Sequence, residues 1–212
     1  SYNGTEISLS KALYLFTGNN TDGFTISAKT ADGTVVYLKP SNGDAGYPSS
    51  TTAATVKCSV GSAENSFYLL DNGNKYLHFY RDGKNVFDRV GTTAGFQAAC
   101  SFLLYRPASA GEESSAEIPG YVQAANLEDI VDGGYYLIVA KYNDTYFALY
   151  PSNSTSSKYS HVVKINAQSE QTTETVSVVS HSLVVTGVAG GTTDVVVDGN
   201  IYRLAVTDNS VI

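Results

Sequence analysis

The chain has 212 residues, of which 42% are hydrophobic and 16% charged, and its formal net charge is −7. This composition indicates one large folded domain or two smaller ones, and it argues against disorder along the whole chain. The 13 Lys and Arg residues form no basic stripe, so we expect no nucleic-acid partner. No hydrophobic run approaches the roughly 20 residues of a membrane-spanning helix, so we expect no membrane insertion.

Turn signals recur along the chain and predict short antiparallel strands. Asp-Gly pairs begin at residues 22, 32, 82, 132 and 198, mostly between alternating or β-branched runs. The first series of predicted strands covers residues 23–29, 34–40, 53–60, 66–70, 75–80, 85–90 and 100–106. The second covers residues 134–141, 145–151, 160–166, 174–180, 182–188, 193–198 and 200–207. A helical turn is expected only at residues 124–131, so the fold class is all-β.

The segment PASAGEESSAEIPG, residues 107–120, separates the two series and has the composition of a linker. We therefore predict two small antiparallel β-sandwich or barrel units in tandem, over residues 1–110 and 121–212, joined by a linker at residues 111–120. Residues 22–44 align without a gap on residues 133–155, which favours a duplicated hairpin. The simpler explanation is two hairpins that use the same turn chemistry.

A weaker similarity relates VVYLKP, KYLHFY and YFALYP, each the outgoing strand of an aromatic hairpin. The units of a β-trefoil have this appearance. However, the spacings between Tyr37, Tyr76 and Tyr146 are 39 and 70 residues, which are too unequal for a regular three-fold repeat. A β-trefoil-like unit followed by an immunoglobulin-like unit is therefore the alternative architecture.

The sequence contains no pattern typical of catalysis or of cofactor binding. It lacks a Gly-x-Ser-x-Gly turn, a glycine-rich phosphate loop and a pair of carboxylates at strand ends, so we expect neither an enzyme nor a cofactor. His78, His161 and His181 stand at no metal-ligand spacing, so we expect no metal. Cys58 and Cys100 are an even pair, compatible with one disulfide in an exported protein and equally with two buried thiols.

The hairpin at residues 74–90 carries the candidate binding site. A two-residue turn at Asp82 and Gly83 would pair Tyr80 with Asn85 and place aromatic and planar polar side chains on one face. The residues expected on that face are Tyr76, His78, Tyr80, Asn85, Phe87 and Arg89. The residues expected on the core face are Leu77, Phe79, Val86 and Val90. A sugar ring can stack on the aromatic side chains while its hydroxyls bond to the polar groups.

The alternative is that this face packs against a neighbouring segment, with Tyr76 and Arg89 as a stacked cross-strand pair. In the same register Asp88 lies on the core side, diagonal to Lys75, and is expected to form a salt bridge at the sheet margin. A turn longer by one residue would exchange the faces of Asp88 and Arg89.

Three stretches of the chain resemble a known class of regions: KYLHFYRDGKNVFDRV, CSFLLYRPASAGEESSAEIPGYVQ and DGGYYLIVAKYNDTYFALYPSNSTSSKYSHVVKI. They are similar to the accessory β-rich regions of large secreted glycoside hydrolases of gut-dwelling Gram-positive bacteria. The tail SLVVTGVAGGTTDVVVDGNIYRLAVTD, residues 182–208, resembles the closing hairpins of bacterial immunoglobulin-like repeats. The resemblance implies a bacterial protein that is extracellular or attached to the cell surface.

The expected function is therefore a non-catalytic glycan-binding accessory module of a larger extracellular glycoside hydrolase. Its expected partner is a host or dietary carbohydrate. The absence of Met and the start at Ser1 suggest a fragment of a longer, multidomain chain. The alternative function is a structural spacer or adhesion stalk without a ligand.

Overall fold

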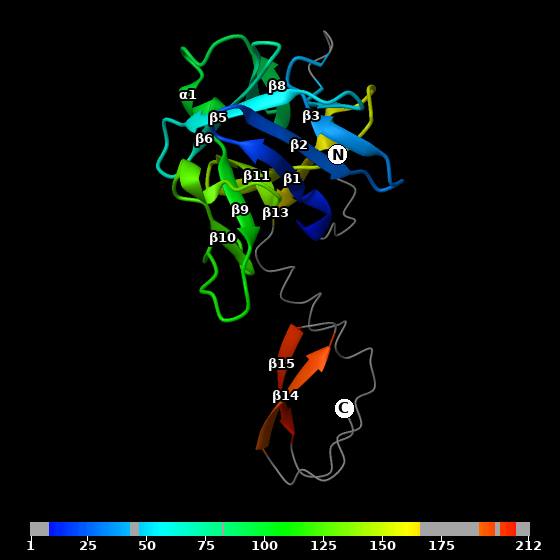
Figure 1. Ribbon diagram of the computed structural model, residues 1–212, viewed down its shortest axis with the longest axis vertical. Helices are drawn as coiled ribbons and strands as arrows, with labels where there is room; N and C mark the ends of the chain where they lie inside the picture. The colour runs from blue at the N-terminus through cyan, green and yellow to red at the C-terminus, as the bar shows by residue number, and fades with distance from the viewer. Residues whose placement is uncertain (1–8, 43–46, 82, 166–190, 198–199, 207–212) are drawn as a thin grey trace. The chain divides into compact units, whose positions relative to one another are not determined.

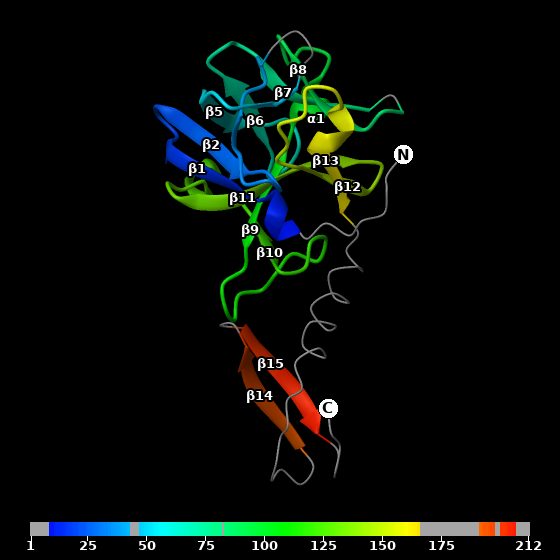
Figure 2. The same cartoon turned by 90° about the vertical axis from the view of Figure 1, so that its right-hand side faces the viewer.

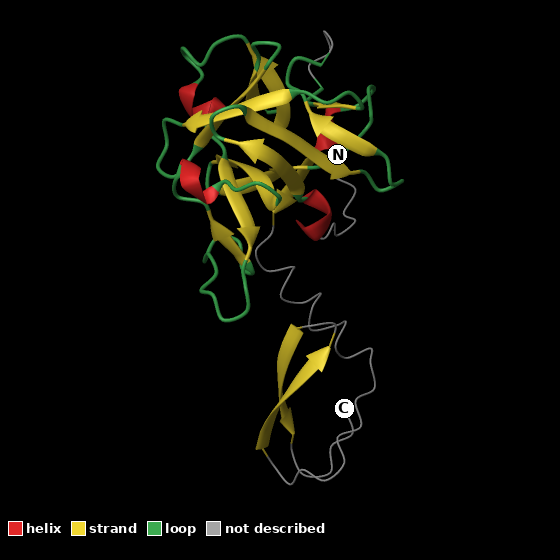
Figure 3. Cartoon of the chain, in the orientation of Figure 1, coloured by secondary structure: helices red, strands yellow, loops and turns green. Residues whose placement is uncertain are grey.

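A computed structural model describes residues 9–42, 47–81, 83–165, 191–197 and 200–206. The chain forms two compact units. The first comprises Ser1–Ala108 and Glu113–Asn166, and the second comprises Ser109–Glu112 and Ala167–Ile212. Strands dominate the described part of the chain and the helices are short (Figure 3), which confirms the all-β prediction.

The first unit contains thirteen strands in one antiparallel sheet. They are β1 (Tyr14–Asn19), β2 (Gly23–Lys29), β3 (Val35–Leu38), β4 (Ser49–Ser50), β5 (Thr55–Val60), β6 (Phe67–Asp71), β7 (Tyr76–Tyr80), β8 (Val86–Val90), β9 (Leu103–Pro107), β10 (Tyr121–Gln123), β11 (Gly134–Tyr142), β12 (Thr145–Leu149) and β13 (Val162–Ile165). Its short helical turns are η1 (Leu9–Ala12), α1 (Gln97–Cys100), η2 (Leu127–Asp129) and η3 (Lys158–His161). The turn expected within residues 124–131 corresponds to η2, whereas η1, α1 and η3 were not expected.

All of these strands except β10 fall into three groups with the same pairing pattern. Group 1 is β1–β4, group 2 is β5–β8, and group 3 is β9, β11, β12 and β13. Within each group the first strand pairs with the second, the second with the third, and the third with the fourth. The second strand also pairs with the first strand of the next group, as in β2–β5 and β11–β1.

The remaining junction, between β6 and β9, is made by a single bridge. Phe67 of β6 and Phe102, which directly precedes β9, exchange backbone hydrogen bonds of 2.8 and 2.9 Å. The series β1–β2–β5–β6–β9–β11 therefore closes on β1 as a six-stranded barrel, and the third and fourth strands of each group form three further hairpins (Figures 1 and 2). This arrangement is that of a β-trefoil.

The trefoil corrects the domain boundary expected at residues 111–120. Strand β11 lies beyond that segment, yet it pairs with β1 and β9, which lie before it. Residues 108–133 are instead a long insertion between the first and second strands of group 3. The finer prediction of two sandwich or barrel units divided at this segment is replaced by the first part of its alternative, a trefoil-like unit that contains the first series and the second series as far as β13.

The three similar segments VVYLKP, KYLHFY and YFALYP contain β3, β7 and β12, the third strand of each group. Their unequal spacing arises largely from the insertion in group 3. The aligned hairpins β2–β3 and β11–β12 occupy equivalent positions, but their turns differ. Tyr142 and Thr145 flank a two-residue turn, whereas Lys29 and Val35 flank residues 30–34, so the ungapped alignment does not preserve the register.

The hydrophobic core includes buried aromatic side chains from all three groups, among them Phe16, Phe67 and Tyr136. The ring of Phe16 lies edge-on to Phe24 and Tyr136, with centroid distances of 5.6 and 5.0 Å. The buried Tyr136 hydroxyl donates to the Asp129 carbonyl at 2.6 Å and accepts from the Val131 N–H at 3.0 Å. Burial of these large rings contributes to the hydrophobic stabilisation of the unit.

Cys58 and Cys100 are free thiols, and both are buried. The disulfide weighed from the even cysteine count is therefore not formed, and the alternative of two buried thiols holds. Burial raises the pKa of Cys58 to about 12 and that of Cys100 to about 11, because the low-dielectric interior disfavours a thiolate.

In the second unit β14 (Gly191–Val197) and β15 (Asn200–Val206) form an antiparallel hairpin. They correspond to the strands expected at residues 193–198 and 200–207. The strands expected at residues 174–180 and 182–188, together with His181, lie outside the described residues. None of the helices in the described ranges is long and apolar enough to cross a membrane.

Candidate functional site

The β7–β8 hairpin differs from its expected register by one residue. Tyr80 pairs with Val86, His78 with Asp88, and Leu77 with Arg89. The connection contains residues 81–85 rather than a two-residue turn, and Asn85 adopts a positive φ of 48°. The predicted pairing of Tyr80 with Asn85 is therefore wrong. Because the side chains of a strand alternate between faces, this shift of one residue moves each β8 side chain to the opposite face from the one predicted relative to β7.

This shift divides the six predicted site residues. Tyr76, His78 and Tyr80 share one face, but Phe87 lies on the core face with an exposed fraction of 0%. The Phe87 ring packs against Phe79 at 5.1 Å and stacks on Phe102 at 5.9 Å between centroids. The assignment of Phe87 as a ligand contact is therefore corrected: it is a core residue.

Arg89 and Asn85 also leave the predicted face. Arg89 lies opposite Leu77 and is half-buried, and Asn85 belongs to the connection between the strands. Asp88 now shares a face with His78 and pairs with Lys158 at 2.9 Å, rather than with Lys75. The connection is longer than the one-residue extension considered from the sequence, but the register shifts by one residue, so Asp88 and Arg89 exchange faces as expected for such a shift.

His78, at the centre of the predicted face, is covered. Its exposed fraction is 6%, and the Phe96 ring meets it edge-on at 5.4 Å. Nearby, the Arg81 guanidinium donates a hydrogen bond to the Ala98 carbonyl, which links this hairpin to α1. Burial lowers the pKa of His78, and Asp88 opposes that shift. For His78 the alternative of a packing face is therefore the correct one.

The two tyrosines of this face remain half-buried. The Tyr76 ring lies edge-on to Tyr68 at 6.2 Å, and Tyr80 packs against the core while the Lys84 ammonium lies 5.4 Å from its ring centroid. Both rings are engaged by protein neighbours. The hairpin therefore offers a sugar less open aromatic surface than its sequence predicts.

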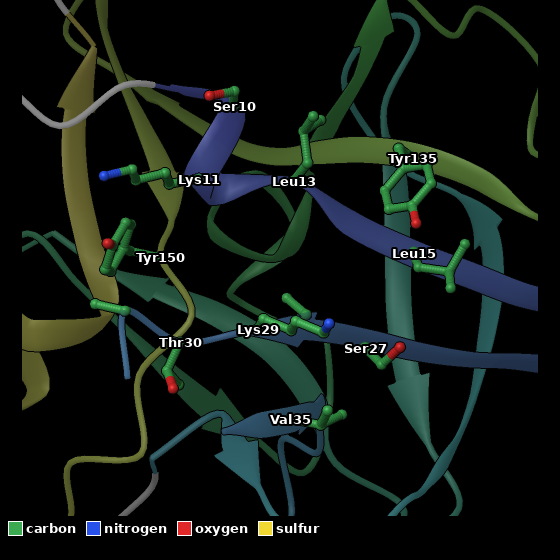
Figure 4. Close-up of a pocket in the computed structure, with 12 residues that line it drawn as sticks. Ser10, Lys11, Leu13, Leu15, Ser27, Lys29, Thr30, Val35, Tyr135 and Tyr150 are labelled. Atoms are coloured by element: carbon green, nitrogen blue, oxygen red, sulfur yellow. The ribbon is translucent and has the colours of Figure 1, made fainter. Parts of the chain in front are cut away.

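A different part of the trefoil contains an open pocket of about 680 Å³ (Figure 4). Groups 1 and 3 both contribute to it, together with η1. The lining residues are Ser10, Lys11, Leu13, Leu15, Ser27, Ala28, Lys29, Thr30, Ala31, Val35, Tyr135 and Tyr150. Figure 4 shows Tyr135 and Tyr150 on opposite sides of the pocket, with Lys29 between them.

Strand register explains why these side chains meet. Leu15 of β1 lies directly opposite Tyr135 of β11 on one side and Ser27 of β2 on the other. Directly opposite residues of antiparallel strands share a face, so these three form one row on the outside of the barrel. Their sequence neighbours Tyr14 and Ile26 point inward and are fully buried.

The next row of the same face begins with Lys29, which lies opposite Val35 of β3. Tyr135, at one end of the first row, and Val35, at the end of the second, both leave hydrophobic area exposed to solvent. Tyr135 is 51% exposed and Val35 is 41% exposed. An aromatic and an aliphatic surface thus lie beside polar side chains on a rigid sheet, which is the composition typical of a small-molecule pocket.

The backbone of Tyr150, on one side of the pocket, is positioned by a buried hydrogen-bond network around His161. The Tyr150 N–H donates to the His161 carbonyl at 3.0 Å. His161 is fully buried; its Nε2 lies 3.0 Å from the Ser154 carbonyl, and its Nδ1 lies 3.4 Å from the Ser49 hydroxyl. Because a carbonyl only accepts, Nε2 carries the proton and Nδ1 accepts from Ser49. Burial lowers the pKa of His161, so the neutral imidazole fits this site.

No carboxylate lines the pocket among the residues that the structure describes. The acid of the adjoining turn, Asp32, accepts from the Thr30 hydroxyl, from the Thr34 N–H at 3.0 Å and from the Asn153 amide at 3.3 Å. The hydrogen bond from Thr30 is the main reason that the pKa of Asp32 lies well below its ordinary value of 3.8. This carboxylate is thus ionised and already occupied by three donors.

Sequence reasoning did not identify this pocket. The alternation in SAK, residues 27–29, predicts that Ser27 and Lys29 share a face. However, β1 was not predicted, and its pairing with β11 joins residues more than 100 positions apart. The described part of the chain contains no group of three or more His, Cys, Asp or Glu side chains that could hold a metal ion.

No protein-family model, curated protein or solved structure matches this chain. The geometry of the pocket and of the hairpin is therefore the basis for assigning a function.

Proposed function

We propose that this chain is a non-catalytic glycan-binding module of a larger extracellular glycoside hydrolase, and that saccharides bind in the pocket between Tyr135 and Tyr150. The single observation that carries the proposal is the pair of tyrosine rings on opposite sides of one open pocket, with hydroxyl and ammonium groups between them. The site thus lies in groups 1 and 3 rather than on the β7–β8 hairpin.

The chemistry of a saccharide matches this surface. One face of a pyranose carries C–H groups that pack on an aromatic ring, and its hydroxyls both donate and accept hydrogen bonds. The half-exposed Tyr135 ring offers such a platform, while the Ser27 hydroxyl and the Lys29 ammonium supply polar groups in the same pocket. The volume of about 680 Å³ falls within the roughly 300–1,000 Å³ typical of ligand pockets.

An open pocket without a tryptophan is expected to bind each saccharide weakly. Attachment to a larger chain would compensate, since a second binding event on the same polymer then becomes intramolecular. This is the behaviour expected of an accessory module that keeps a hydrolase near its substrate.

The test is a glycan array followed by NMR titration of the ¹⁵N-labelled 212-residue chain with each positive saccharide. We expect amide shifts at residues of β1, β2 and β11, and a loss of affinity of about tenfold or more in Tyr135→Ala, as for an aromatic anchor worth about 1.4 kcal/mol. Tyr159→Ala is the matched control, because Tyr159 is 55% exposed and does not line the pocket.

The proposal fails if no saccharide shifts these amides, or if Tyr135→Ala and Tyr159→Ala bind equally well. The first of these results would favour the alternative function, a spacer or adhesion stalk without a ligand.

A further inference from the structure

We propose that the pocket selects anionic saccharides, with Lys11 and Lys29 binding a carboxylate or sulfate group on the sugar. This inference rests on the proposed function and adds to it the chemical class of the ligand.

The charge of the pocket is opposite to that of the protein. The chain carries 20 acidic residues against 13 basic ones, for a net charge of −7. Yet the described residues that line the pocket include two lysines and no Asp or Glu. A positive pocket on an acidic protein attracts anions locally and repels them elsewhere, which concentrates an anionic ligand at one place.

The two lysines come from different elements and approach the pocket separately. Lys11 is the third residue of η1, and Lys29 is the last residue of β2. Figure 4 shows the Lys29 side chain in the middle of the lining residues and Lys11 beside Tyr150. A ligand that stacks on a tyrosine would thus place its substituents near an ammonium group.

Neither lysine is neutralised by an ion pair with a carboxylate within the described ranges, whereas Lys158 pairs with Asp88 at 2.9 Å and Lys141 with Asp144 at 3.7 Å. The nearby Asp32 accepts from Thr30, Thr34 and Asn153, as described above. The Asp32 carboxylate therefore accepts from its own turn and from the loop after β12, and not from the pocket lysines.

The two lysines favour an acidic sugar over a neutral one. A neutral sugar needs both donors and acceptors around its hydroxyls, whereas a lysine ammonium offers three donors and no acceptor. Two such groups beside an aromatic wall suit an acidic substituent on a stacked ring better than a neutral one. Binding of that kind weakens as salt screens the charges, while stacking does not.

The experiment compares matched pairs of saccharides that differ in charge. They are sialyllactose and lactose, trigalacturonate and its carboxyl-reduced counterpart, and sulfated and unsulfated N-acetyllactosamine. Titration calorimetry and NMR are carried out on the full chain at low and high NaCl. We expect the acidic member of at least one pair to bind about tenfold tighter than the neutral one at low salt, with the difference shrinking at high salt. The carboxylate and sulfate pairs show which anion is preferred.

Three variants assign the effect to the pocket. Lys11→Gln and Lys29→Gln should each reduce the preference for the acidic sugar, and the double variant should bind both members of a pair equally. Lys57→Gln is the control, because Lys57 is an exposed residue of β5 outside the pocket. Thermal melts verify that each variant is folded.

The possible failures are distinguishable. If neutral and acidic members bind equally, or if the lysine variants retain the preference, the anionic ligand class is wrong while the glycan-binding proposal stands. If no member of any pair binds and the glycan array is also negative, the proposed function fails and this inference fails with it; if the array gives only neutral ligands, the anionic ligand class alone is wrong.

Discussion

The Lys158 ammonium lies 2.9 Å from the Asp88 carboxylate, and this ion pair joins η3, which connects β12 and β13 of group 3, to β8 of group 2. It lies on the face where the sequence predicted sugar contacts. The partly buried pair, together with Phe96 over His78, shows that neighbouring segments of the trefoil occupy this face.

The ion pair between Asp88 and Lys158 should contribute measurably to stability. The side chains are 23% and 32% exposed, so solvent screens their attraction only in part. A double-mutant cycle with Asp88→Asn and Lys158→Gln, measured by urea denaturation, should give a coupling of about 0.5–1 kcal/mol. The Lys141–Asp144 pair, with 50% and 97% exposure, is the control and should give a coupling near zero. Equal couplings in the two cycles would contradict this assignment.

Truncation of Phe87 should destabilise the protein far more than truncation of a binding-site ring. Phe87 is fully buried between Phe79 and Phe102, so Phe87→Ala leaves a cavity and should lower the free energy of unfolding by about 3–5 kcal/mol. Tyr135→Ala removes a ring that is 51% exposed and should cost less than about 1 kcal/mol. The two values come from denaturant unfolding curves. A small effect at Phe87 would support its original assignment as a surface residue.

Stability should fall as the pH is lowered below about 6.5, in part because of His161. Burial lowers its pKa from the ordinary value of 6.5, so the unfolded chain takes up a proton at a higher pH than the folded chain does. The stabilisation is complete above the unfolded pKa and is lost as the pH falls towards the lower folded pKa.

Urea denaturation at several pH values between 5 and 7 tests this expectation. The free energy of unfolding should decrease less steeply in His161→Gln than in the natural sequence, even where the variant is the less stable of the two at every pH. An NMR titration in which the His161 imidazole of the folded protein is protonated at pH 6.5 or above would rule out this explanation.

The two cysteines should be unreactive in the folded protein and reactive in the unfolded one. Burial holds the pKa values of Cys58 and Cys100 at about 12 and 11, so little thiolate forms near neutral pH. A thiol reagent such as DTNB should label neither residue natively and both in denaturant, without prior reduction. The reduced, denatured protein gives the full count for comparison. Failure to label either cysteine before reduction would show that a disulfide had formed.

Local signals in the sequence located most of the strands. The alternation in GFTISAK predicted residues 23–29, and β2 covers the same residues. Leu77 and Phe79 were expected on the core face and are buried. Val86 and Val90 were expected on the same face, but they pair with Tyr80 and Tyr76 on the other one, where Val86 is buried and Val90 is half-buried. Strands β1, β4 and β10 were missed: β1 lies ahead of the first predicted strand, and β4 and β10, with two and three residues, are too short for a periodic pattern.

The sequence by itself determined the all-β class, the positions of most strands and the aromatic third strand of each group, because these depend on alternation and turn chemistry between near neighbours. The tertiary structure decided the rest. The length of the β7–β8 connection set which residues of that hairpin face the core, and a shift of one residue buried Phe87. Pairing of β11 with β1 closed the barrel across the expected linker and brought Tyr135 beside Leu15 and Ser27. Contacts between residues so distant in sequence depend on how the whole chain closes, and no local pattern specifies them.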